Sequence, residues 1–455
     1  MKLIKKIVTY IAVCSCCIAS MTANSVNAAS VRRGDVNLDG IVTGSDVLEL
    51  IDYKLGRITL NPDAMLNADV DSDGEVHVID LAYIKQFVMG DNIPFIYKPS
   101  TELTEGEYPA SENYVKMLGR TYMKEDILWL AQSASGIEFE FTGTSAEITI
   151  VGDNSISGDS KARFAVYVNG ERVMDELVSN AEKTYTVFSS EESKENTVRL
   201  VKLSESANST IGIKNIKAKS VGDIAPTAYK DYTIEFIGDS ITCGYGVDVE
   251  DRNLHFSTAT EDATKTYAYQ TAQRLNADCS LVSYSGYGVI SGYTSDGTRN
   301  TAQLLPTYYE DFAFSYGYYN GFNVGSIDWD FNKLVPDMIV INLGTNDSNY
   351  CQNSTEKQQE FTDGYVDFIK QVRSNNPDSY ILCTLGIRGD TLYPCVESAV
   401  SAYTSQTGDT KVSSMAFDVQ KYEDGYGADW HPSLLTHTKA ADKLTAEIEK
   451  IMAKS

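Results

Sequence analysis

The chain is 455 residues long and strongly acidic, with 63 Asp and Glu residues against 38 Lys and Arg and a formal net charge of -25. This length exceeds one ordinary compact core and predicts several folded modules. A surface this negative repels phosphate backbones and anionic lipids, which argues against nucleic acid or a membrane as partner. A calcium ion or a neutral sugar polymer is compatible with it.

Residues 1–28 have the pattern of a bacterial export signal. Lysines at the start precede an apolar run at 7–18, and residues 26–28 (VNA) form a small-residue cleavage pattern. The apolar run is shorter than the roughly 20 residues that a membrane-spanning helix needs. We therefore expect a secreted, extracellular protein that begins near Ala29.

An acidic pattern with a glycine occurs twice near the N-terminus. Residues 35–40 (DVNLDG) recur as 69–74 (DVDSDG), and an apolar stretch of helical period follows each copy. Oxygen-bearing side chains fall at loop positions 1, 3, 5 and 12, the spacing that wraps six to eight oxygens around calcium. The expected ligands are Asp35, Asn37, Asp39, Ile41 and Asp46, then Asp69, Asp71, Asp73, Glu75 and Asp80, with Ile41 and Glu75 giving backbone carbonyls.

Position 12 is Asp rather than the Glu of ordinary EF-hands, and no helix is expected before either loop. The pair, over residues 34–90, resembles the dockerin module of cellulosomal enzymes. The resemblance implies a small all-α module at 29–90, two structural Ca²⁺ ions and a scaffold cohesin as partner. Its recognition pairs map onto Gly44-Ser45 and Val78-Ile79, which differ and so argue against symmetric docking in two orientations. A calcium-stiffened module without a partner is the alternative.

Two further pattern changes follow along the chain. Residues 91–107 are polar and contain prolines, which is typical of a linker. From 108 to 225, short runs such as 137–141 and 164–168 alternate apolar and polar residues, and the second run ends at an Asn-Gly turn. This period of two predicts antiparallel strands, most economically arranged as an all-β jelly-roll sandwich.

From 226 to 455, apolar strands alternate with helical stretches. The predicted strands are 233–237, 280–284, 338–343 and 380–385, and the predicted helices are 264–276, 357–375 and 434–453. This order is typical of an α/β domain with a parallel sheet, whose active site lies at the carboxyl ends of the strands.

Polar motifs follow three of these strands, and a fourth motif lies near the C-terminus. They are Gly238-Asp239-Ser240, Ser285-Gly286-Tyr287-Gly288, Gly344-Thr345-Asn346-Asp347 and Asp429-Trp430-His431-Pro432. In this order they resemble the SGNH hydrolases. The preceding sandwich, with LGRT at 118–121 and a tryptophan at 129, makes the resemblance closest to carbohydrate esterase family 2 over residues 108–455.

The resemblance implies an acyl-enzyme mechanism that needs no catalytic cofactor. Ser240 is then the nucleophile and His431 the base, because an unactivated hydroxyl is a poor nucleophile. The amides of Ser240 and Gly286 and the side chain of Asn346 are the implied donors to the oxyanion. Gly288 is the alternative oxyanion glycine.

The residue that orients the base is left open. Most SGNH enzymes place an Asp three residues before the His, whereas here Ala428 has that place and Asp429 stands two before. Pro432 restricts His431 to extended conformations, and in an extended backbone the side chains of 429 and 431 share a face. We therefore expect Asp429 to orient the imidazole, with a backbone carbonyl and a Ser–His dyad as the alternative.

Aromatic residues are frequent in an insertion at 308–330 between the second and third strands of the sheet. Trp329 in this insertion and Trp430 beside the base are the candidate platforms for stacking sugar rings. We expect the tyrosines to pack the insertion against the domain. Five cysteines lie beyond the export signal, and Cys243 near the nucleophile is expected to be a buried filler.

These features together predict a secreted cellulosomal esterase that removes acetyl groups from xylan, mannan or glucan. A lipid or thioester hydrolase of the same superfamily is the alternative among enzymes, although no lipid-binding stretch is visible. A non-catalytic carbohydrate-binding module is the alternative from another class. The intact Ser240, Asn346 and His431 argue against it, since binding alone needs no nucleophile.

Overall fold

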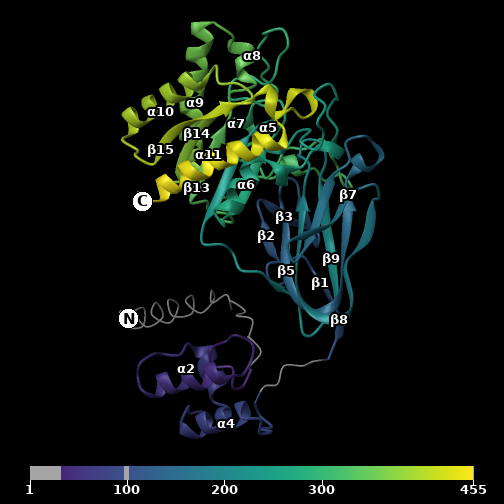
Figure 1. The fold of residues 1–455 in the computed structure, drawn as a ribbon, viewed down its shortest axis with the longest axis vertical. Helices are drawn as coiled ribbons and strands as arrows, with labels where there is room; N and C mark the ends of the chain where they lie inside the picture. The colour runs from purple at the N-terminus through teal and green to yellow at the C-terminus, as the bar shows by residue number, and fades with distance from the viewer. Residues whose placement is uncertain (1–31, 97–101, 454–455) are drawn as a thin grey trace, which may run out of the picture. The chain divides into compact units, whose positions relative to one another are not determined.

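The computed structural model describes residues 32–96 and 102–453, so the predicted export signal at 1–28 lies outside the described residues. The chain divides into two compact units, one up to residue 101 and one from residue 102 on (Figure 1). In the described residues, no helix is long and apolar enough to cross a membrane.

The described part of the first unit, residues 32–96, contains three helices and the two acidic loops. Helices α2 (Gly44–Lys54) and α4 (Val78–Val88) each follow a loop, and α3 (Pro62–Ala68) ends directly before the second loop. The expectation that no helix precedes either loop is therefore wrong for the second one. The apolar core is small, with Leu50 and Ile84 fully buried at its centre, so it supplies limited stabilisation of its own.

The second unit begins with a ten-stranded antiparallel sheet, of which the main path runs β3-β4-β9-β5-β8-β6-β7. Strand β1 pairs with β9, and β2 and β10 pair with β5. Register shifts near Gly143 and Ala146 interrupt the long pairing of β5 with β8. The strands are β1 (Thr104–Tyr108), β2 (Lys116–Leu118), β3 (Thr121–Lys124), β4 (Ile127–Leu130), β5 (Gly136–Gly152), β6 (Arg163–Val168), β7 (Glu171–Leu177), β8 (Glu182–Lys202), β9 (Ile211–Ser220) and β10 (Ala225–Pro226).

The rest of the second unit is an α/β domain around a five-stranded parallel sheet of order β12-β11-β13-β14-β15. The strands are β11 (Thr233–Gly238), β12 (Asp278–Ser283), β13 (Met338–Asn342), β14 (Tyr380–Ile387) and β15 (Val412–Val419). The helices are α5 (Ser240–Cys243), α6 (Tyr267–Arg274), α7 (Leu305–Tyr308), α8 (Asp347–Cys351), α9 (Thr355–Asn375), α10 (Tyr393–Thr407) and α11 (Leu434–Met452).

Alternate residues of each strand face opposite layers of helices, as period two requires. Ile237 and Ile341 pack in the cluster that holds the buried residues of α9 and α10, whereas Phe236 and Val340 pack with α6 and α11. Figure 1 shows these helix pairs flanking the sheet. Helices on both faces leave the carboxyl edge of the strands as the open place for a site.

A buried ion pair joins the antiparallel sheet to the α/β domain. The Arg120 guanidinium, which is fully buried, donates to both carboxylate oxygens of Glu235 at 3.2 and 3.1 Å. It also donates to the carbonyl of Tyr309 at 2.7 Å. Removing either partner would leave the other charge buried and unpaired, which is strongly destabilising. The ion pair therefore ties the antiparallel sheet to the α/β domain.

Candidate active site

Ser240 and His431 meet at the carboxyl edge of the parallel sheet. Ser240 is the first residue of α5, directly after β11, and the Asp239 side chain caps this turn by accepting from the Ile241 amide at 3.0 Å. The Ser240 Oγ lies 2.8 Å from Nε2 of His431. The two residues are 7% and 5% exposed. This geometry lets the imidazole take the hydroxyl proton.

A backbone carbonyl orients the imidazole of His431. Its Nδ1 lies 3.1 Å from the carbonyl oxygen of Ala428, which can only accept, so the proton belongs on Nδ1. The ring of Tyr245 stacks on the imidazole with 3.9 Å between centroids. Nε2 is thereby left with its lone pair towards Ser240.

The structure places the Asp429 carboxylate away from the imidazole, so the preferred expectation for this residue is wrong. The carboxylate accepts from the Tyr245 hydroxyl at 2.7 Å and the Phe256 amide at 3.0 Å, and lies 2.9 Å from Nδ1 of His255. The physical reason is the backbone: Asp429 and Trp430 have φ of 49° and 63°, in the left-handed region. The stretch from 429 to 431 is not extended, and the two side chains do not share a face.

The three implied oxyanion donors follow three neighbouring strands, β11, β12 and β13. The Nδ2 of Asn346 donates to the Tyr287 carbonyl at 2.8 Å and lies 3.4 Å from Asp239 Oδ2, which ties the three motifs together. Among the described residues, the amides of Ser240 and Gly286 make no hydrogen bond. Both are therefore available to an incoming oxygen.

Gly288, the alternative oxyanion glycine, has its amide committed elsewhere. It donates to the Gln303 carbonyl at 3.1 Å. A Cβ at this position would lie 2.1 Å from the Ser291 carbonyl oxygen and 2.6 Å from Asp347 Oδ2, so only glycine fits. The geometry favours Gly286 as the donor and gives Gly288 a packing role.

Asp347 fixes the loop after β12 by accepting hydrogen bonds from its backbone. Its fully buried carboxylate accepts from the amides of Val289, Ile290 and Ser291 at 2.8 to 3.0 Å. Burial raises its pKa to about 6, against the opposing effect of these amides. The aspartate of the third motif therefore holds the residues that directly follow the second motif.

Arg388 is the site residue that the sequence analysis missed. It follows β14, and its Nη1 lies 3.2 Å from Nε2 of His431 while Nη2 donates to the carbonyl of Asp429 at 3.0 Å. Burial of His431 and then the positive charge of Arg388 lower the pKa of His431 to about 3. Nε2 has one lone pair, so Arg388 and the Ser240 hydroxyl compete for it. Its place at a strand end was the available signal.

The two candidate aromatic platforms have different environments. Trp430 is 47% exposed beside His431, with the Arg252 guanidinium 4.1 Å from its ring centroid and Tyr426 at 5.3 Å. Trp329 is only 7% exposed and packs with Phe312 and residues of the antiparallel sheet such as Trp129.

Trp329 therefore does not reach the catalytic edge, which is the carboxyl edge of the parallel sheet where Ser240 and His431 meet. Its prediction as a substrate platform is wrong. It lines a cleft of 400 Å³ that also contacts Thr233 and Asp278, the first residues of β11 and β12. That cleft lies at the amino ends of the strands, opposite Ser240. Apolar packing against the neighbouring sheet offers the indole more buried contact than an exposed loop would.

The acidic loops of the first unit share one hydrogen-bond pattern. In the first, Asp35 accepts from the Gly40 amide at 3.0 Å, and in the second, Asp69 accepts from the Gly74 amide at 3.0 Å. The position-12 carboxylates of Asp46 and Asp80 are fully buried and each accept backbone amides.

Each acidic loop contains a buried carboxylate oxygen that makes no hydrogen bond within the described residues. Asp35 and Asp69 each have a buried Oδ1 without a hydrogen-bond partner among the described residues. In the second loop, ligand atoms of Asp69, Asp71 and Asp80 lie within 4.8 Å of one another. Orphaned oxygens in this arrangement fit calcium, a hard cation that takes oxygen ligands.

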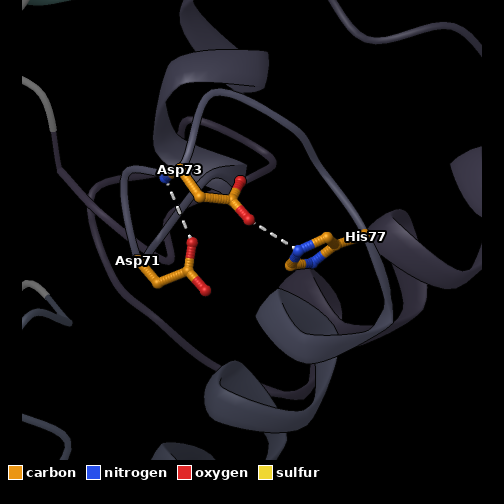
Figure 2. A group of neighbouring side chains, drawn as sticks. All are labelled: Asp71, Asp73 and His77. Carbon is orange, nitrogen blue, oxygen red and sulfur yellow. Dashed lines mark hydrogen bonds and ion pairs between the residues drawn. The ribbon is translucent and has the colours of Figure 1, made fainter.

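His77, at position 9 of the second loop, also faces the acidic cluster. Figure 2 shows its ring directed at Asp73, with the Asp71 carboxylate nearby. The Nε2 atom lies 2.8 Å from Oδ2 of Asp73. Its Nδ1 lies 2.9 Å from the Asp80 carboxylate. The sequence analysis gave this residue no role, although its loop position was visible.

Three family models match the chain, one for each predicted module. The dockerin type I domain matches residues 33–89, the carbohydrate esterase 2 N-terminal domain matches 117–227, and the GDSL-like lipase/acylhydrolase family matches 236–438. These matches confirm the resemblances found in the sequence.

Individual relatives agree with the family models. The chain is 31% identical to the cellulase/esterase CelE of Acetivibrio thermocellus over 323 residues, which cover 70% of this chain and 37% of the relative. It is 24% identical to an acetylxylan esterase/glucomannan deacetylase of Cellvibrio japonicus, covering 75% and 90%. The structure of a family two carbohydrate esterase from Clostridium thermocellum, in complex with cellohexaose, aligns with a TM-score of 0.65 and 29% identity, covering 74% of this chain and 99% of that one.

Proposed function

We propose that this chain, which combines the family 2 carbohydrate esterase regions with a dockerin, releases acetate from plant cell-wall polysaccharides. The 2.8 Å contact between Ser240 and His431, next to the unpaired amide of Gly286, is the observation that carries the proposal. A buried serine, a neutral imidazole and free amide donors are the parts that acyl transfer needs.

The reaction begins when Oγ of Ser240 attacks the acetyl carbonyl as Nε2 of His431 takes its proton. The oxyanion of the tetrahedral intermediate accepts from the amides of Ser240 and Gly286. It also accepts from Nδ2 of Asn346, which gives up its 3.4 Å contact with Asp239 to do so. His431 then gives the proton to the leaving sugar oxygen, which departs as a hydroxyl. Water, deprotonated by the same imidazole, attacks the acyl-enzyme, and the proton passes to Oγ of Ser240 as acetate leaves.

The Ala428 carbonyl replaces the third triad member in this proposal. It accepts a hydrogen bond from Nδ1–H of His431. The dipole of the carbonyl stabilises the imidazolium that forms in each half-reaction. A dyad of Ser240 and His431 follows. Asp429 supports the site indirectly through Tyr245, whose ring stacks on the imidazole.

The substrate in this proposal is an acetylated xylan, mannan or glucan chain. Trp430 is the platform, because it is exposed next to His431 and sugar rings stack their apolar faces on aromatic rings. The names of the relatives support this class: one is an acetylxylan esterase/glucomannan deacetylase, and one related structure contains cellohexaose.

The first unit, in this proposal, is an all-α dockerin that attaches the enzyme to the cohesin of a scaffold protein outside the cell. Two calcium ions, held by the ten residues predicted above, would stiffen its loops. The proposed modules are an export signal at 1–28, the dockerin at 29–90, a linker at 91–107, a jelly-roll sandwich at 108–225 and the hydrolase at 226–455. The esterase reaction itself uses no cofactor.

The test is acetate release by the full chain from acetylated xylan, acetylated glucomannan and acetylated cello-oligosaccharides, with Ser240→Ala as the matched control. We expect release from at least one polymer by the wild type and none by the variant. Release of fatty acid or thiol from long-chain esters or thioesters, without acetate from any polymer, would favour the lipid or thioester alternative. Polymer binding without hydrolysis would favour the binding module.

A further inference from the structure

A loop of the antiparallel sheet is inserted into the α/β domain. Residues 203–210, between β8 and β9, are all buried except Asn208, although loops usually lie on the surface. The Leu203 carbonyl accepts from the Ala263 amide at 3.0 Å, and the Ala207 carbonyl accepts from the Tyr316 amide at 3.0 Å. Partners from the α/β domain thus satisfy the backbone of this loop.

Glu205 in this loop reaches the catalytic edge. Its Oε2 accepts from the Ser285 amide at 2.7 Å, and Ser285 immediately precedes Gly286. The thiol of Cys243, the last residue of the helix that starts at Ser240, lies 3.6 Å from the same oxygen. The other oxygen accepts from Asn208 at 2.9 Å. One carboxylate therefore contacts both the proposed oxyanion loop and the nucleophile helix.

The surroundings of Glu205 supply compensating charge and further support. Lys202, also buried, donates to the carbonyls of Ser204 and Glu205 at 2.5 and 3.1 Å. The Glu205 amide donates to the carboxyl of Glu261 at 2.9 Å. Burial raises the pKa of Glu261 well above its usual range. Burial also raises the pKa of Glu205, against the Ser285 amide, the Cys243 thiol and the Lys202 charge, which lower it. Both oxygens of Glu205 only accept, as suits a carboxylate.

We infer that Glu205 is a positioning residue, supplied by the antiparallel sheet, that fixes the Ser285–Gly286 backbone so that the Gly286 amide points at the oxyanion. The inference rests on the proposed function. Gly286 has a φ of 84°, in the flexible left-handed region of glycine. The Gly286 carbonyl accepts from the Tyr293 amide at 2.7 Å, and Asp347 holds residues 289–291. The contact of Glu205 with the Ser285 amide fixes the backbone on the other side of this glycine.

The test uses the full-length protein and 4-nitrophenyl acetate, with Glu205→Ala as the main variant. We expect kcat to fall by about 10²-fold, the usual cost of losing one oxyanion donor, with KM within about threefold. An alkylboronic acid forms a tetrahedral anion on the serine, so its affinity should fall by a similar factor. A role in the fold alone would not link these two losses.

Two conservative variants and one control keep the test decisive if Glu205→Ala does not fold. Glu205→Gln keeps an acceptor for the Ser285 amide and should retain kcat within about tenfold, whereas Glu205→Asp is a methylene short and should resemble Ala. Asn208→Ala removes a contact to the same carboxylate without touching Ser285, and should leave kcat and boronate affinity unchanged.

Two results would overturn the inference. One is a folded Glu205→Ala with kcat within threefold of wild type, and the other is a lowered kcat with unchanged boronate affinity. If Glu205→Ala does not fold, a folded Glu205→Asp that gives either result overturns it equally. A wild type that hydrolyses no ester would instead overturn the proposed function, so the two failures are distinguishable.

Discussion

Carboxylates gather in two regions of this molecule, and their negative charge is managed differently in each. In the loops of residues 32–96, Asp35 and Asp69 keep a buried oxygen without a protein partner. At the catalytic edge, Asp347 is fully buried but accepts three backbone amides. We propose that an ion completes the first region, whereas the second is preorganised by its own fold. Each of the following changes should therefore affect one region and spare the other.

The largest effect is expected from Ser240→Ala. Hydrolysis should fall by about 10⁶-fold, because the remaining oxyanion donors cannot replace the nucleophile. Thermal unfolding and calcium binding should match the wild type, since the hydroxyl contacts only His431 in the described residues. Hydrolysis within tenfold of wild type would exclude the mechanism.

Calcium removal should act on the other region. With calcium at about 1,000 times its Kd, the ions stabilise the first unit by about 4 kcal/mol per site, which is a large part of a small domain's stability. A chelator should therefore unfold residues 32–96 and abolish cohesin binding. Limited proteolysis would detect the unfolding, and calorimetry would measure the loss of binding. Acetate release should not change. Unchanged cohesin affinity in excess chelator would contradict the dockerin proposal.

Arg388→Ala should change the pH dependence of hydrolysis. The neutral imidazole of His431 is the base, and burial together with the Arg388 charge lowers its pKa to about 3. Activity is then present above this pKa and lost as the pH falls through it. Removing the positive charge raises the pKa, so the acid limb of kcat/KM should move upward by about one unit.

The control for this variant is Arg388→Lys, which keeps a positive charge and should move the limb less. A limb that stays in place or moves to lower pH in Arg388→Ala would show that the guanidinium does not act on the imidazole.

The smallest effect is expected from Asp429→Asn. The carboxylate does not touch His431, and it reaches the site only through Tyr245. We expect kcat to fall by less than about tenfold, since the Ala428 carbonyl still holds the Nδ1 proton. A loss near 10⁴-fold, as when an orienting aspartate is removed from a full triad, would restore Asp429 to that role.

Local pattern predicted much of the fold. The strands β11, β12, β13 and β14 lie within a few residues of their predicted ranges, because continuous apolar runs mark buried parallel strands. Strand β15 was missed: it is an edge strand, and only three of its eight residues are buried. Helix α3 was missed because its seven residues are too short for a periodic signal.

The candidate site was predictable where a motif carried it and not where geometry decided. Ser240 and His431 lie where strand ends and motif order indicated. The Asp429 prediction failed because it assumed an extended backbone, and left-handed residues cannot be read from residue types alone. Arg388 has no motif, and its contact depends on the tertiary fold. Trp329 was misassigned because an aromatic residue in an insertion fits packing as well as sugar binding.

The main-chain support of His431 has a consequence for how such sequences diverge. A carbonyl group is present whatever side chain occupies position 428, so no acidic side chain is needed there to orient the imidazole. What the contact requires is conformational: two successive left-handed residues, a geometry that asparagine, aspartate and glycine tolerate best. Surveys that search for an acidic residue three places before the histidine would pass over a chain of this kind. A better criterion for such a survey is a left-handed backbone conformation at the two residues before the histidine.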